Sequence, residues 1–178
     1  MQLDYNDLIL GGRAGLEAAL ATGYRCTRFQ QALDTYRAEI RDPHGELVMH
    51  RTPDFGDWDT FGAFVDTSTF AALQAAAENA YPPPAGGGWQ MDCVERLLDT
   101  LTMHRRHINQ MAARRNLQFV DPSKDGDPWA TGSNHYIPQS TTPQARAKAL
   151  EHLAETVPGC LVWEKPQEDW VPVDQITV

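Results

Sequence analysis

The chain has 178 residues, of which 42% are hydrophobic and 22% charged, and its formal net charge is −9. This composition is that of a globular protein and excludes the disordered and fibrous classes, so we expect residues 1–178 to form a single domain. No apolar run approaches the ~20 residues needed to span a bilayer, and the acidic balance disfavours non-specific binding to nucleic acid.

The cysteines and the N-terminal residues indicate the compartment. The N-terminal residues MQLDYNDLIL lack the basic start and small-residue cleavage site of a secretory signal peptide. Cys26, Cys93 and Cys160 are far apart and odd in number, which argues against a disulfide framework or a CxxC zinc ribbon. We expect each cysteine to fill a small buried space, and the protein to be cytoplasmic, or part of the virion if it comes from a phage.

Residues 8–20, LILGGRAGLEAAL, resemble the FAD fingerprint of flavin-dependent oxidoreductases, in which a strand runs into GxGxxG and then a helix. Gly12 and Gly15 match the second and third glycines, but Leu10 stands in place of the first, where the chain must turn tightly. The next segment is predicted as a helix where a second parallel strand should begin. We therefore expect a glycine-interrupted helix that ends at Gly23, and no cofactor.

The rest of the first half is predicted as two helices and a strand. Apolar residues recur at three-to-four spacing behind a capping box, which predicts a helix over 27–40. The alternation in ELVMHR predicts a strand at 46–51. A helix capped by Asp66 or Thr67 is expected to run through TFAALQAAAENA. The breaker YPPPAGGG at 81–88 is a point at which the domain could divide internally.

The second half opens with the longest predicted helix, 91–116, in which an apolar stripe runs between an acidic start and an arginine-rich end. LQFV at 117–120 is a short predicted strand, and a helix over 143–156 is expected to follow a cap at position 142. Residues 160–178 are predicted to form a hairpin whose last strand is an edge, because it contains Pro172. Together these elements predict an α+β, predominantly helical domain with a small antiparallel sheet or C-terminal hairpin.

Residues 121–141 form a long polar segment without a regular pattern, and loops of this length are usually functional. Its start, DPSKDGDPW, resembles an EF-hand calcium loop, with polar residues at the first, third, fifth and seventh positions. These are Asp121, Ser123, Asp125 and Asp127. The twelfth position, which should be a bidentate Glu, is Gly132. The prediction is therefore an acidic loop built from Asx turns.

The histidines suggest a metal site as an alternative. His104 and His107 lie one helical turn apart, a spacing that metal ligands on helices use. Asp121, Asp125 and His135 could complete the site if the polar segment folds back. NHYIP, around His135, resembles a fragment of the HNH nucleases, without their supporting Asn and second His at suitable spacing. The competing interpretation makes His104 a core residue within the apolar stripe and His107 a residue of the flanking surface.

The sequence contains no P-loop, no CxxC and no complete catalytic set. We therefore expect a non-enzymatic interaction protein or a structural subunit of a larger assembly, of viral or phage type among others, with a protein partner or further copies of itself. Arg105, Arg106, Trp129 and Tyr136 are the predicted interface anchors, because these residue types dominate binding hot spots. The alternatives are a metal-dependent hydrolase, and an acidic inhibitor or immunity-type protein that covers a basic site on its partner.

Overall fold

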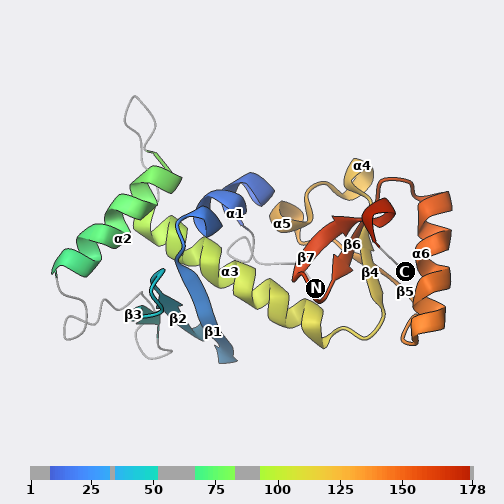
Figure 1. Cartoon of the computed structure of the whole chain (residues 1–178), viewed down its shortest axis with the longest axis horizontal. Helices are drawn as coiled ribbons and strands as arrows, with labels where there is room; N and C mark the ends of the chain where they lie inside the picture. The colour runs from blue at the N-terminus through green and yellow to red at the C-terminus, as the bar shows by residue number, and fades with distance from the viewer. Residues whose placement is uncertain (1–8, 33–34, 52–66, 83–92, 177–178) are drawn as a thin grey trace. The chain divides into compact units, whose positions relative to one another are not determined.

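The computed structural model describes residues 9–32, 35–51, 67–82 and 93–176 (Figure 1). The chain is α+β, as predicted, and its described strands form two separate antiparallel sheets. Its contacts divide it into a first unit, Ile9–Arg106, and a second unit, His107–Val178. The predicted internal division at 81–88 lies mostly outside the described residues. None of the described helices is long and apolar enough to cross a membrane.

The first unit combines helices with a three-stranded antiparallel sheet of order β1-β2-β3. Its elements are α1 (Gly12–Ala21), β1 (Arg25–Ala32), β2 (Thr35–Arg41), β3 (Leu47–Arg51), α2 (Thr67–Ala80) and most of α3 (Cys93–Ala113). The core takes side chains from helices and strands alike, and its fully buried members include Ile40, Leu73, Leu97, Leu98 and Leu101. The predicted strand at 46–51 and the predicted helix through TFAALQAAAENA are confirmed.

The predicted helix over 27–40 is wrong, because this segment contributes to the hairpin of β1 and β2. Along β2, the buried Ala38 and Ile40 alternate with Arg37 and Glu39, which point to the opposite face. Ile40 is also paired with Met49 of β3, so both residues enter the same core. Burial of one face of a sheet, which is a non-local gain, therefore outweighs the helical spacing.

The glycines in α1 and at its two ends allow backbone conformations and close contacts that a side chain would hinder. Gly11 and Gly12 have positive φ angles of 85° and 56°, and Gly23, at φ 83°, follows the end of the helix, as expected for a glycine-interrupted helix. A Cβ atom on Gly15 would lie 2.2 Å from the carbonyl oxygen of Leu10. The strands after α1 pair antiparallel, so the chain does not continue into the parallel βαβ unit that a dinucleotide fold requires.

The cysteines are free thiols, in agreement with the prediction that they form no disulfide framework. Cys26 and Cys160 are buried, whereas Cys93 is half-buried and donates its S–H to the carbonyl oxygen of Tyr81 at 3.1 Å. Burial raises the pKa of the Cys26 thiol to about 11. A thiol with so high a pKa is protonated at neutral pH and is a poor nucleophile.

The second unit contains a four-stranded antiparallel sheet of order β5-β4-β6-β7 (Figure 1). After the end of α3 its elements are β4 (Leu117–Val120), α4 (Pro122–Asp125), α5 (Pro128–Thr131), β5 (His135–Ile137), α6 (Pro143–Thr156), β6 (Leu161–Glu164), β7 (Asp169–Pro172) and η3 (Val173–Gln175). α6 packs on the sheet through a core that includes Leu117, Leu150, Leu153, Cys160 and Val162.

The predicted strand at 117–120, the helix over 143–156 and the C-terminal hairpin are confirmed, with Pro172 on the edge strand β7. The hydroxyl of Thr142 accepts a hydrogen bond from the Ala145 amide and so caps α6, as predicted. In contrast, the segment 121–141 was expected to be irregular, and it contains the two short helices α4 and α5 and the strand β5.

Gly15→Ala tests the close approach in α1. Alanine in a helix interior normally stabilises a protein by about 1 kcal/mol relative to glycine. Because the new Cβ would meet the Leu10 carbonyl oxygen, we expect the free energy of unfolding to fall instead, by about 1–3 kcal/mol. Urea unfolding followed by circular dichroism measures the change, and a stabilised variant would show that the contact does not constrain the helix.

Candidate functional site

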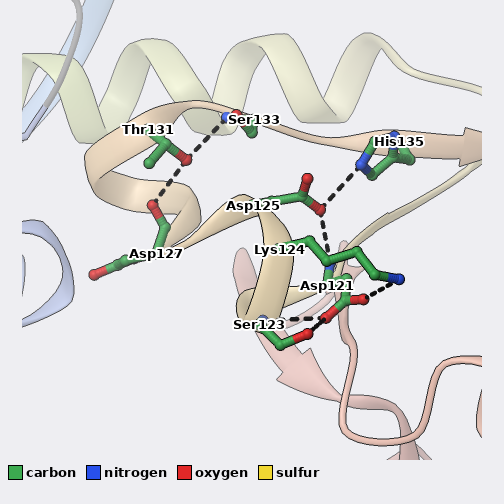
Figure 2. A network of polar contacts seen from close by, with 8 residues as sticks. All are labelled: Asp121, Ser123, Lys124, Asp125, Asp127, Thr131, Ser133 and His135. Atoms are coloured by element: carbon green, nitrogen blue, oxygen red, sulfur yellow. Dashed lines mark hydrogen bonds and ion pairs between the residues drawn. The ribbon is translucent and has the colours of Figure 1, made fainter.

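The polar segment 121–135 is held by its own side chains (Figure 2). One Asp121 carboxylate oxygen accepts from the Ser123 amide at 3.1 Å and from the Ser123 hydroxyl at 2.6 Å, which caps α4. The other oxygen pairs with the Lys124 ammonium at 2.9 Å. These hydrogen bonds from Ser123 and Lys124 lower the pKa of Asp121.

A second capping turn follows at once and repeats the arrangement. The Asp127 carboxylate accepts from the Trp129 amide at 2.9 Å and caps α5, which ends at Gly132 in the left-handed conformation. The Thr131 hydroxyl donates to the Asp127 carbonyl oxygen at 3.1 Å and accepts from the Ser133 amide at 3.2 Å (Figure 2). The expected Asx turns are therefore present.

Asp125 connects the first capping turn to β5. One of its carboxylate oxygens lies 3.0 Å from the Nε2 atom of His135 and also accepts from the Asp121 amide at 3.0 Å. The Asp125 side chain is 16% exposed and that of His135 54% exposed. The hydrogen bond from His135 is the main cause that lowers the pKa of Asp125. The pair therefore fixes the start of β5 against the loop.

The arrangement does not form a catalytic dyad of nucleophile and base. The Ser123 hydroxyl donates to Asp121, so it is not directed to the imidazole of His135. The structure brings together Asp121, Asp125 and His135, three of the predicted metal-ligating residues. Nevertheless, no group of three or more His, Cys, Asp or Glu side chains within the described residues is arranged to hold a metal ion.

The other two predicted metal-ligating residues lie on α3. His104 is half-buried in the first unit. His107 is also half-buried, in the second unit, and this corrects its interpretation as a flanking surface residue. Its ring lies among three indoles, with centroid distances of 4.6 Å to Trp129, 5.4 Å to Trp163 and 5.9 Å to Trp170.

This aromatic cluster of His107, Trp129, Trp163 and Trp170 was not predicted. The Trp170 indole N–H donates to Nε2 of His107 at 3.1 Å, so this nitrogen acts as the acceptor and carries no proton in the contact. The three indoles are 2–3% exposed. Tight aromatic packing around one hydrogen-bonded imidazole is the arrangement of a core.

The predicted interface anchors have different environments. Trp129 is 3% exposed within the aromatic cluster, whereas Tyr136 is 60% exposed on β5. Arg105 and Arg106 are half-buried on α3. Among these four residues, Tyr136 therefore presents the largest accessible aromatic surface.

Comparison of the chain with protein-family models, with curated proteins and with solved structures found no match. In the polar segment and β5 the carboxylates of Asp121, Asp125 and Asp127 are engaged in capping and in ion pairs, and the large hydrophobic side chain that is exposed is Tyr136.

The contact between Asp125 and His135 predicts a pH effect. Because the folded state lowers the pKa of Asp125, the ionised carboxylate stabilises the fold above the usual Asp range, and this stability is lost as the pH falls through the lowered pKa. An NMR titration should give Asp125 a pKa below the usual value of about 3.9. His135→Ala should raise it, while Asp121 keeps its lowered pKa as an internal control. An unchanged Asp125 titration in the variant would contradict this assignment.

Two matched substitutions test the aromatic cluster. Trp170→Phe removes the hydrogen bond to His107, which should lower the free energy of unfolding by about 1 kcal/mol beyond the loss of packing. In the part of the chain that the structure describes, the buried Nε1 of Trp163 has no hydrogen-bond partner, so Trp163→Phe loses packing alone. Urea unfolding should therefore rank Trp170→Phe as the less stable variant, and the reverse order would contradict the role given to the hydrogen bond.

Proposed function

We propose that this chain is a non-enzymatic interaction subunit that docks onto a protein through a surface centred on Tyr136. The observation that supports this most is the 60% exposure of a tyrosine on a strand that side-chain hydrogen bonds hold near both of its ends. Tyrosine is enriched in binding hot spots, where its ring supplies contact area and its hydroxyl a hydrogen bond. The subunit would belong to a cytoplasmic assembly or, in a phage or virus, to the particle.

The strand that carries Tyr136 is fixed at both of its ends. At its first residue, the His135 side chain contacts Asp125 at 3.0 Å, and the His135 ring lies 5.4 Å from that of Phe119. After it, the hydroxyl of Ser140, which is 5% exposed, donates to the Ile137 carbonyl oxygen at 2.6 Å and accepts from the Leu117 amide at 2.7 Å. A preformed binding strand loses little conformational entropy when a partner binds.

The position of β5 in the sheet also favours docking. Among the described strands it is an edge strand, paired with β4, with Tyr136 opposite Gln118. An edge strand offers backbone donors and acceptors to a second chain. The short length of β5 limits that pairing, so the tyrosine side chain is the expected source of most of the binding energy.

The chain itself is the first partner to test. Size-exclusion chromatography with light scattering over a range of concentrations should reveal self-association. If the chain does not self-associate, affinity capture should reveal a heteromeric partner. Tyr136→Ala should weaken the association at least about tenfold, as expected for loss of an aromatic hot spot. The substitution should leave the melting temperature nearly unchanged, because the side chain is exposed.

Phe70→Ala is the matched control, since Phe70 is an exposed aromatic residue of α2 in the first unit, 37% accessible. This variant should associate as the wild type does. A chain that stays monomeric and captures no partner, or a Tyr136→Ala variant that binds normally, would refute the docking role. Strong weakening of a heteromeric complex by salt, without an effect of Tyr136→Ala, would instead favour an acidic inhibitor.

A further inference from the structure

One face of the β1-β2-β3 sheet gathers positive charge on an otherwise acidic chain. The strand register places Arg28 opposite Glu39 and Gln30 opposite Arg37, on the face opposite to the buried Ala38. Beyond the irregularity between Cys26 and Arg28 in β1, the next opposed pair on this face is Arg25 and Arg41. We call this surface the arginine face, and its charged members are Arg25, Arg28, Arg37, Arg41 and Glu39.

Among the described strand residues of this face, the arginines outnumber the carboxylates. Glu39 is its single carboxylate among the described strand residues, and lies 3.1 Å from a guanidinium nitrogen of Arg28 and 3.9 Å from one of Arg41. Arg25 and Arg41 occupy directly opposite positions, an arrangement of like charges that destabilises a sheet. Arg37 is exposed, and no hydrogen bond or ion pair joins its guanidinium group to another described residue.

Backbone carbonyl groups hold two of these guanidinium groups in place. Arg25 donates to the carbonyl oxygens of Leu20 at 2.7 Å and Tyr24 at 2.6 Å. Arg41 donates to the carbonyl oxygen of Gly45 at 2.9 Å. Neutral acceptors restrict the side chains without cancelling their charge, so the cations are oriented before any anion arrives.

We propose that the arginine face binds an acidic segment of a partner protein, whose Asp and Glu side chains pair with these guanidinium groups. Arginine is suited to this because its planar group can hold a carboxylate with two parallel hydrogen bonds. Glu39 shows that a carboxylate can pair on this face, since it accepts a hydrogen bond from Arg28 at 3.1 Å and lies 3.9 Å from a guanidinium nitrogen of Arg41. The surface lies in the first unit and needs nothing from Tyr136, so each proposal can fail alone.

A protein segment fits this face better than a nucleic acid does. The aromatic side chains Phe29 and Tyr36 pack against each other on the opposite face at 5.3 Å. The ring on the described part of the arginine face is that of His50, opposite Glu39, and because it is half-buried it offers little surface on which a base could stack. Leu47 lies opposite Arg41 and is 40% exposed, which gives an apolar contact for a protein side chain.

Binding of a fluorescein-labelled polyglutamate peptide, followed by fluorescence anisotropy at low ionic strength, tests the proposal on the full chain. The wild type should bind the peptide, and added salt should weaken the complex. The double variant R28Q/R37Q should bind at least about fivefold more weakly, from the loss of two exposed ion pairs. R114Q/R115Q is the matched control, because it removes two exposed arginines of the second unit and changes the net charge equally.

Each outcome decides for or against the proposal. Absence of peptide binding by the wild type, or equal weakening in both double variants, would overturn it. A labelled oligothymidylate of matched charge that binds more tightly than the peptide, and loses binding in R28Q/R37Q, would assign the face to nucleic acid and overturn the acidic-protein partner. Circular dichroism checks that the variants fold. If R28Q/R37Q is unfolded, Arg37→Gln alone, compared with Arg115→Gln, makes the same test with a smaller expected effect.

Discussion

The surface on which the proposed function depends exists because a long polar segment satisfies its own backbone groups. Asp121 and Asp127 each cap a short helix, and Asp125 joins the first of these helices to β5 through His135. Without these acceptors the amide groups at both helix starts would lack protein partners. The same hydrogen bonds that order the loop occupy carboxylate lone pairs of Asp121, Asp125 and Asp127. These lone pairs are the ones with which the carboxylates would bind a metal ion or a substrate.

Local signals explain which parts of the fold the sequence predicts. Thr142 and Pro143 mark the start of α6, and a single apolar stripe defines α3, so both helices are predicted correctly. The segment 27–40 fits two periods at once, since Ile40 belongs both to a helical stripe and to an alternating strand. Only the pairing with β3 selects the strand, and that information lies outside the segment.

The candidate site divides in the same way. The Asx turns at Asp121 and Asp127 follow from residues two or three positions away, and they are predicted. The aromatic cluster is not, because His107, Trp129 and Trp170 come from separate elements and meet only in the folded unit. A tryptophan in a polar segment therefore resembles an interface anchor in the sequence, although Trp129 is buried.

Net charge is a poor guide to what a surface of this protein can bind. The value of −9 averages over all residues, whereas a sheet sorts its side chains by alternation, and in β1 and β2 alternation collects arginines on one face. An approaching partner experiences mainly the charges within about a Debye length, ~10 Å at moderate salt. Along its described strand residues the arginine face presents four guanidinium groups and one carboxylate, while Asp42 and Glu46 lie in the turn after Arg41, so the proposed attraction of anions is a local property of β1 and β2 that the overall composition conceals.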